Sequence, residues 1–276
     1  MSTQKPEDSA IFEAIVAAAI EAGKVVHDFY RGEFDVQRKA DASPVTDADN
    51  AAEAVILKRL REIAPQIPVI AEEEVAAGRV PEIGNEFFLV DPLDGTKEFI
   101  QKRGDFTVNI ALIRDRSPVL GVVYAPAKSS LFAGNVTAKA AFRSDENTDS
   151  PDHAPRRPIK VRPVPASGVI AVSSRSHSTP ETDAYLAQVN VADRVSVGSS
   201  LKFCLVATGE ADLYPRLGPT MEWDTAAGHA VLVAAGGSVW GPGGVPMLYA
   251  KPTFRNTYFI ASGTLKAPPL AAARVP

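Results

Sequence analysis

Two aspartates at the end of an apolar segment are the residues of this chain best placed to do chemistry. Residues 87–90 (Phe-Phe-Leu-Val) read as a buried strand, and Asp91-Pro-Leu-Asp94 and Gly95-Thr96 follow directly. Proline fixes the backbone after Asp91 and glycine permits a tight bend after Asp94, so both carboxylates and the Leu93 carbonyl can converge. Hard oxygen ligands on a stiff turn suit Mg²⁺. The alternative is an ordinary polar turn, because Asp and Gly are common turn residues.

Two further acidic segments lie where elements are expected to begin or end. Glu72-Glu73-Glu74 follows a short apolar run, Pro68 to Ala71, and Asp224 precedes a helical pattern from Ala226 to Ala235. Taken singly, Asp224 could be a helix cap and the glutamates a solvated face. Together with Asp91 and Asp94, these acids predict a joint metal cluster.

The motifs resemble a known family. Asp91-Pro-Leu-Asp-Gly-Thr96, the Glu72-Glu73 pair and Trp223-Asp-Thr-Ala-Ala-Gly228 together resemble the inositol monophosphatase-like superfamily of Mg²⁺-dependent, lithium-sensitive phosphatases. The segments Asp91 to Phe99, Gly198 to Cys204 and Tyr214 to Arg216 resemble its CysQ branch. These are the 3′(2′),5′-bisphosphate nucleotidases, which hydrolyse adenosine 3′,5′-bisphosphate (PAP). The resemblance extends from about Asp8 to about Ser262.

The resemblance implies a layered αβαβα sugar-phosphatase fold, of mixed α+β and α/β character, and a set of metal ligands. Glu72, Asp91 and the Leu93 carbonyl would hold one Mg²⁺, and Asp91, Asp94 and Asp224 a second. Thr96, held by an acid of the segment Val45 to Asp49, would orient and deprotonate the attacking water; the spacing Val-Thr-x-x-Asp assigns this acid as Asp49 rather than Asp47. Glu73 would assist at a third, weakly held metal.

The substrate-binding residues follow from the same resemblance and from charge. The hydrolysed phosphate would lie near Gly95 and Thr96, at the start of a short helix. A bisphosphate needs a second, positive anchor, for which Lys202, close to Ser199, and Arg216 are the candidates, with a solvent-facing base as the alternative for Lys202. The segment Arg175-Ser176-His177 would border the nucleotide. PAPS is a further candidate substrate, and sulfur assimilation the pathway implied.

Rival functions remain open at this point. An inositol monophosphatase or a fructose-1,6-bisphosphatase on the same scaffold would share the carboxylates, since related folds carry different pockets. A PAP-sensing regulatory protein would bind without turnover, although a binder does not need the pair formed by Thr96 and Asp49. No Gly-x-x-x-x-Gly-Lys-Ser/Thr segment is present, which leaves direct attack by a metal-activated water.

Composition narrows the class of protein without deciding the activity. The net charge is −4, so no basic field suggests nucleic acid as a partner, and we expect a small-molecule substrate instead. The single cysteine, Cys204, fits a reducing compartment, and no apolar run approaches the ~20 residues needed to span a bilayer. We therefore expect a cytoplasmic protein, with peripheral association at the inner membrane as an alternative and the oligomeric state open.

The chain of 276 residues is expected to form two tightly joined halves of one catalytic unit. Residues 1–150 form an α+β half that carries most metal ligands, and residues 151–276 an α/β half that carries Asp224 and the substrate-binding residues. Apolar periodicity predicts helices from Ser9 to Tyr30, capped by Asp8, and from Asp47 to Ile63. Asp145 to Arg157 reads as a solvated loop, and the Ala- and Pro-rich C-terminus as a loose tail.

Overall fold

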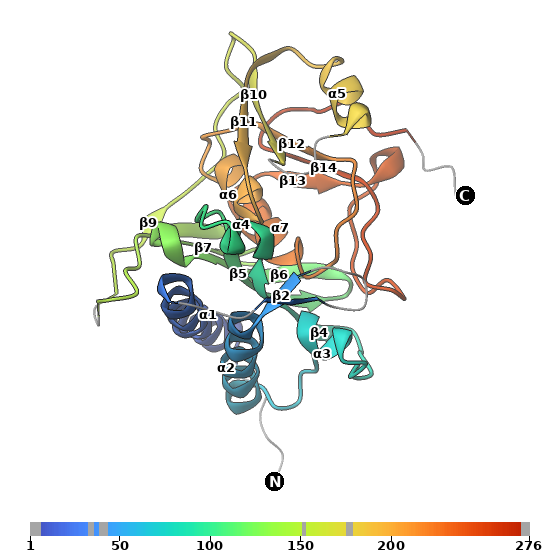
Figure 1. Cartoon of the computed structure of the whole chain (residues 1–276). Coiled ribbons are helices and arrows are strands. Elements are labelled where there is room, and N and C mark those ends of the chain that lie inside the picture. The colour runs from blue at the N-terminus through green and yellow to red at the C-terminus, as the bar shows by residue number, and fades with distance from the viewer. Residues whose placement is uncertain (1–6, 33–35, 39–43, 151–152, 175–178, 272–276) are drawn as a thin grey trace.

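Helices and sheets alternate in layers (Figure 1). The computed structural model describes residues 7–32, 36–38, 44–150, 153–174 and 179–271. Helices α1 (Asp8–Arg31) and α2 (Asp47–Ile63) cover one face of a seven-stranded sheet, and α6 (Leu201–Ala207) and α7 (Ala226–Ala234) separate it from a five-stranded sheet. Helix α5 (Pro180–Leu186) packs on the far side of the second sheet. This arrangement confirms the predicted αβαβα layering.

The seven-stranded sheet comes from the first part of the chain. Its strands pair in the order of the sequence: β3 (Val69–Ala71), β4 (Glu86–Asp94), β5 (Thr107–Arg114), β6 (Ser117–Ala125), β7 (Ser130–Asn135), β8 (Ala140–Ser144) and β9 (Arg157–Pro158). Strands β3 and β4 are parallel, whereas the other neighbours are antiparallel. The short helices α3 (Glu72–Ala76) and α4 (Thr96–Ile100) directly follow β3 and β4.

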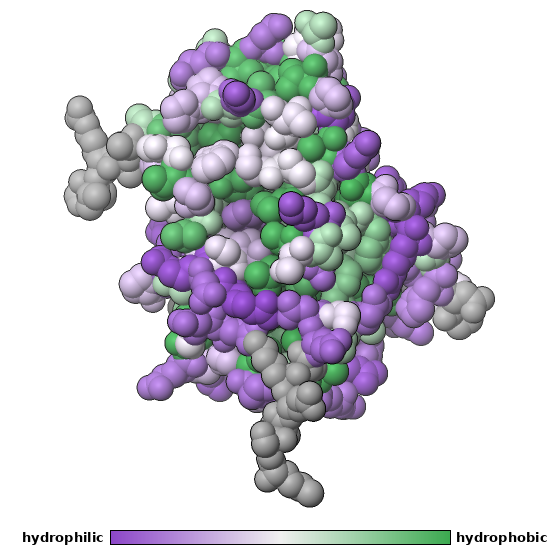
Figure 2. Space-filling model, turned by 180° about the vertical axis from the view of Figure 1, so that it is seen from behind, coloured by the Kyte–Doolittle hydropathy of each residue, from purple (hydrophilic) through white to green (hydrophobic). Residues whose placement is uncertain are grey.

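Both faces of this sheet are buried, which explains the continuous apolar run that ends at Asp91. Phe88 and Val90 face α1 and α2, and Phe87 and Leu89 face α6 and α7. Side chains alternate across a strand, so a strand covered on both faces is apolar at every position. The outer surfaces of α1 and α2 are polar. Their exposed residues include Glu13, Glu21, Asn50 and Lys58. On the face seen in Figure 2, hydrophilic side chains gather in the lower part of the molecule.

Two glycines let α7 approach the sheet closely. A Cβ atom on Gly121 of β6 would lie 2.5 Å from the Ala227 carbonyl oxygen, and one on Gly134 of β7 would lie 2.7 Å from Val231 Cα. Any larger residue would push the helix away. Because Asp224 lies just before α7, this packing sets its distance from the ends of β3 and β4.

The second sheet has the order β11-β10-β12-β14-β13. Its strands are β10 (Val169–Ser174), β11 (Val191–Val197), β12 (Leu213–Arg216), β13 (Ser238–Trp240) and β14 (Phe259–Ser262). A two-stranded ribbon of β1 (Val36–Arg38) and β2 (Pro44–Thr46) precedes α2, and the 3₁₀ turns η1 (Pro126–Lys128) and η2 (Pro242–Gly244) complete the described elements. None of the helices in the described ranges is long and apolar enough to cross a membrane.

Three local expectations were wrong. Asp8 begins α1 rather than capping it: Glu7 is the N-cap, and the Asp8 carboxylate binds Arg114 at 2.8 Å instead. The segment after β8 is not fully solvated, because Glu146 and Thr148 are buried and Thr148 hydrogen-bonds His27. The predicted loose tail is packed as far as residue 271, because Leu270 joins the core of the second sheet and Tyr185 donates to the Pro268 carbonyl, whereas residues 272–276 lie outside the described residues.

Candidate active site

The register of two parallel strands brings Glu72 and Asp91 together. Ala71 of β3 pairs with Val90 of β4, so the next residue in each strand lies at the same edge of the sheet. Asp224 reaches this edge from the other side, at the start of α7. Each of these acids offers one carboxylate oxygen, and the oxygens all lie within 4.8 Å of one another. The predicted convergence of acidic segments from three parts of the sequence is present in the structure.

The turn after Asp91 is shaped by its own side chain. Asp91 Oδ1 accepts the Leu93 N–H at 3.0 Å, and the pairing of β4 with β5 shifts register between Asp91 and Asp94. Asp91 and Leu93 are buried, whereas Asp94 is partly exposed and lines the adjacent cavity. Asp94 thus lies beside the group formed by Glu72, Asp91 and Asp224 rather than within it.

These carboxyls lie where negative charge is costly. Burial, together with Glu72, Asp94 and Asp224, raises the pKa of Asp91 well above its ordinary value. Burial and the neighbouring carboxylates Asp94 and Glu72 do the same to the pKa of Asp224. Burial raises the pKa of Asp94 to about 6, although Lys202 opposes the rise. Without a cation the cluster therefore retains protons at pH values where exposed aspartates have lost them.

Asp49 and Thr96 meet close to this cluster. Thr46 caps α2, and Asp49 Oδ2 accepts both the backbone N–H and the hydroxyl of Thr46 at 2.7 Å, which fixes its rotamer. Its other oxygen, Oδ1, lies 3.5 Å from Thr96 Oγ1, which is also 3.3 Å from the Leu93 carbonyl oxygen. Burial, and then the nearby Glu73 and Glu72, raises the pKa of Asp49 to about 7. A carboxyl with this pKa can exchange a proton near neutrality.

A cavity of about 250 Å³ opens beside the acids. Its walls carry three kinds of side chain: acids, including Glu72, Asp94 and Asp224; bases, namely Lys97, Lys202 and Arg216; and the aromatic rings of Phe203 and Tyr214. Gly95, Thr96 and Ser199, which the sequence predicts to bind substrate, also line the cavity. One cavity therefore joins the acidic cluster to a basic wall.

The two predicted anchors, Lys202 and Arg216, are both buried rather than solvent-facing. Burial lowers the pKa of Lys202 to about 8, and its ammonium bonds the Ser199 carbonyl. Arg216 Nη2 donates to the Pro219 carbonyl at 2.8 Å. Among the described residues, Arg216 Nε has no hydrogen-bond partner although it is buried. Because Lys202 and Arg216 both line the cavity, their positive charges lie beside the acidic cluster.

The remaining predicted residues divide into two groups. Glu73 is buried at the start of α3, where its N–H donates to Glu53 Oε2 at 2.8 Å. Arg175, Ser176 and His177 lie outside the described residues.

Several supporting residues had not been found from the sequence. Ser200 Oγ bonds Thr107 Oγ1 at 2.9 Å and Asn109 Oδ1 at 2.7 Å, and so ties α6 to β5. Glu53 accepts the backbone N–H groups of Glu73 and Glu74, and so fixes the start of α3. In the sequence, the role of Glu53 is indicated only by its position: it is a charged residue next to Ala52 on the buried side of α2.

The chain belongs to the inositol monophosphatase family, whose profile matches residues 7–275. It is similar to proteins named 3′(2′),5′-bisphosphate nucleotidase CysQ. One from Salmonella typhimurium is 46% identical over 231 residues, which cover 83% of this chain and 89% of the relative. One from Escherichia coli K12 is 44% identical over 255 residues, which cover 91% and 99%.

Solved structures agree with the fold. The crystal structure of CysQ from Bacteroides thetaiotaomicron, described as a bacterial member of the family, matches with a TM-score of 0.79 at 37% identity, covering 94% of this chain and 99% of that chain. An inositol monophosphatase from Anabaena matches with a TM-score of 0.71 at 26% identity, covering 95% and 98%. The predicted family, CysQ branch and fold are confirmed.

Proposed function

We propose that this protein is a 3′(2′),5′-bisphosphate nucleotidase that releases the 3′-phosphate of PAP to give AMP and phosphate. The carrying observation is a single cavity in which the acids Glu72, Asp94 and Asp224 face Lys202 and Arg216. A substrate with two phosphates can present one to each wall. The identity of 44% to 46% with relatives named for this activity supports the same conclusion.

The donor set of the acidic cluster fits a hard divalent cation. The group formed by Glu72, Asp91 and Asp224 presents carboxylate oxygens, and the raised pKa values of Asp91 and Asp224 show that negative charge there lacks a compensating cation. Glu72, Asp91 and the Leu93 carbonyl would hold one Mg²⁺, and Asp91, Asp94 and Asp224 a second, with Glu73 near a third. Bound Mg²⁺ supplies positive charge to the phosphate oxygens and acidifies water.

The residues of the chain then have separate tasks. Thr96 Oγ1 orients the attacking water, and Asp49 takes the proton through its oxygen Oδ1. The Leu93 carbonyl, 3.3 Å from Thr96 Oγ1, holds the hydroxyl at the end of β4. Because Asp49 is itself fixed by two hydrogen bonds from Thr46, the pair needs no rearrangement before reaction.

Recognition of the second phosphate is assigned to Arg216 and Lys202. The Arg216 guanidinium lines the cavity and offers hydrogen-bond donors, and the buried Lys202 ammonium supplies charge where water screens it little. Ser199 and Gly95 offer backbone groups at turns with positive φ, 49° and 95°. Arg175, Ser176 and His177 keep their proposed contact with the nucleotide on sequence grounds, and PAPS remains a second candidate substrate.

We further propose that the halves 1–150 and 151–276 act as one catalytic unit. Asp224, Lys202 and Arg216 come from the second half, whereas Asp49, Asp91 and Thr96 come from the first. The cytoplasmic location and the sensitivity to lithium remain predictions from the sequence and the family resemblance.

Product identification tests the proposal. Purified protein with Mg²⁺ and PAP should yield AMP, separated by chromatography, together with one equivalent of phosphate. Formation of adenosine 3′-phosphate would mean that the other ester is cleaved. PAP that binds but stays intact in a single-turnover reaction would support a sensor instead.

A further inference from the structure

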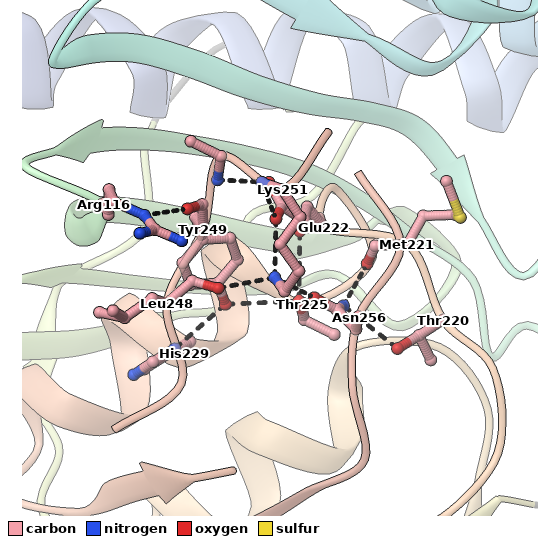
Figure 3. A network of polar contacts seen from close by, with 11 residues as sticks. Arg116, Thr220, Met221, Glu222, Thr225, His229, Leu248, Tyr249, Lys251 and Asn256 are labelled. Carbon is pink, nitrogen blue, oxygen red and sulfur yellow. Dashed lines mark hydrogen bonds and ion pairs between the residues drawn. The ribbon is translucent and has the colours of Figure 1, made fainter. Parts of the chain in front are cut away.

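A buried polar network holds the segment that contains Asp224. It joins residues 219–225, which lead into α7, to residues 249–256, which lead into β14 (Figure 3). Neither segment has regular secondary structure, apart from the single antiparallel bridge between Met221 and Arg255. Two backbone hydrogen bonds, from Glu222 N–H to the Phe254 carbonyl and from Asn256 N–H to the Thr220 carbonyl, join the segments, and side-chain contacts supply the remaining links.

Asn256 holds the segment that contains Asp224 from one side. Its Nδ2 group donates to the Met221 carbonyl at 2.6 Å and lies 3.1 Å from Thr220 Oγ1 and 3.0 Å from Thr225 Oγ1. Figure 3 shows Asn256 close to all three residues. Met221 in turn donates its N–H to Asp224 Oδ2 at 2.8 Å, so Asn256 reaches Asp224 through one intervening residue.

Glu222 fastens the same segment from the other side. Its side chain is completely buried, and it accepts the N–H groups of Ala250 and Lys251 at 2.9 and 3.0 Å. Its own N–H donates to the Phe254 carbonyl at 2.7 Å. A buried carboxylate that accepts backbone donors fixes both segments, because moving either one leaves polar groups unpaired.

Lys251 closes the network and balances its charge. Its ammonium lies 2.7 Å from Glu222 Oε1 and 3.2 Å from Asn256 Oδ1, and its side chain is 19% exposed. Without this cation, Glu222 would be an uncompensated buried carboxylate two residues from Asp224, where negative charge is already concentrated.

We propose that Glu222, Lys251 and Asn256 are positioning residues for metal binding. Together they hold the Asp224 carboxylate within reach of Glu72 and Asp91 before a cation arrives. This inference rests on the proposed role of Asp224 as a metal ligand, and it adds residues outside the acidic cluster that set the affinity of the site. A preorganised ligand loses less conformational freedom on binding, so weakening the network weakens cation binding.

The test compares two matched variants by direct Mn²⁺ binding, measured by electron paramagnetic resonance without substrate. Glu222→Gln keeps the shape of the side chain but removes its charge and turns an amide toward backbone donors. Asp212→Asn is the control: Asp212 is also buried, accepts the Ile170 N–H at 2.8 Å and pairs with Arg162 at 2.7 Å, outside the Asp224 network. We expect Mn²⁺ affinity to fall about fivefold or more in Glu222→Gln and to stay within about twofold of wild type in Asp212→Asn.

A second readout separates positioning from loss of stability. Because metal binding pulls Asp224 back into place, saturating Mg²⁺ should restore the kcat of Glu222→Gln to within about twofold of wild type, whereas its half-activating Mg²⁺ concentration stays raised. Equal Mn²⁺ affinities in the two variants, at similar losses of melting temperature, would overturn the inference. Asp224→Asn separates failure of this inference from failure of the proposed metal site. If this variant also binds Mn²⁺ normally, the proposed metal site itself is wrong.

Two measurements keep the test decisive if Glu222→Gln does not fold. Lys251→Met removes only the partly exposed cation and should also weaken Mn²⁺ binding, and unchanged affinity there would contradict the inference. In the wild-type protein, Mg²⁺ should slow hydrogen exchange at the amides of Ala250, Lys251 and Asn256, because coupling between ordering and binding is reciprocal. Unchanged exchange at these amides would also contradict it.

Discussion

Thr96 Oγ1 lies 3.5 Å from Asp49 Oδ1, although 47 residues separate the two in the chain. The contact forms because both residues lie in the first turn of a helix that closely follows a strand. Asp49 is in the first turn of α2, after β2, and Thr96 begins α4, after β4. The acid is locked by Thr46 on its other oxygen. This geometry is the basis of the proposed role of the pair in accepting a proton from the attacking water.

Substitution of this pair should slow the chemical step and leave substrate binding intact. Thr96→Val and Asp49→Asn should each lower kcat by about 10²- to 10⁴-fold, the range for general-base catalysis, with little change in KM. Steady-state kinetics with PAP checks this. If the double variant loses no more than either single variant, the two act as one unit, whereas an unchanged kcat in either would remove the pair from the mechanism.

Asp91→Asn should abolish turnover without unfolding the protein. Asp91 is the acid shared by both proposed metal positions, so we expect kcat/KM to fall by at least about 10³-fold, roughly 4 kcal/mol. At a pH high enough to ionise Asp91, replacing a carboxylate that is destabilised by burial and by Glu72 and Asp224 with a neutral amide should also raise the melting temperature of the metal-free protein. Scanning calorimetry in EDTA and phosphate-release assays measure the two effects. Near-normal activity would contradict the metal assignment.

The stability of the metal-free protein should depend on pH in a specific direction. The pKa values of Asp49 and Asp94 are about 7 and about 6 when folded, above the ordinary value of 3.8. At pH values between the ordinary pKa and the raised pKa of each group, the folded state therefore binds more protons than the unfolded state. The free energy of unfolding falls as the pH rises through this interval.

In EDTA, the melting temperature should therefore drop between about pH 5 and pH 8, and Mg²⁺ should raise it most at the upper end of this range. Thermal unfolding monitored by circular dichroism at several pH values, with and without Mg²⁺, makes the comparison. A melting temperature in EDTA that rises over this interval would be inconsistent with the burial of these carboxyls.

Lys202→Ala should impair bisphosphate substrates selectively. Loss of the buried ammonium removes the charge proposed to bind the second phosphate, so the KM for PAP should rise about tenfold, roughly 1.4 kcal/mol, while a nucleoside monophosphate is affected less. Lys97→Ala is the matched control, because Lys97 lines the same cavity but is exposed. Equal changes in KM for both substrates would remove Lys202 from the second-phosphate site.

Part of the site could be predicted because its residues lie in short motifs at the ends of recognisable elements. The apolar run before Asp91 marks a strand with two covered faces, and the run before Glu72 marks its parallel neighbour, so the meeting of the two acids follows from strand pairing. Helix α2 begins and ends at the predicted residues, Asp47 and Ile63, because its apolar spacing and its first-turn acids agree.

The remaining parts depend on contacts that no local pattern encodes. The role of Glu53 in holding α3 requires α2 to lie beside β3, and the bond from Ser200 to Asn109 requires α6 to lie over β5. Asp8 was misread as a cap because a helix-initial acid looks the same whether it accepts a backbone N–H or, as here, Arg114. Glu222 and Asn256 are adjacent in space but 34 residues apart, so their network could not be inferred from the sequence.

The most direct test of the account is phosphate release by the purified protein with Mg²⁺ from three substrates in parallel: PAP, inositol 1-phosphate and fructose 1,6-bisphosphate. We predict a kcat/KM for PAP about tenfold or more above the other two, roughly 1.4 kcal/mol of differential transition-state binding. A preference for inositol phosphate or the sugar bisphosphate would contradict the nucleotidase assignment and the roles given to Lys202 and Arg216, while leaving the metal cluster intact.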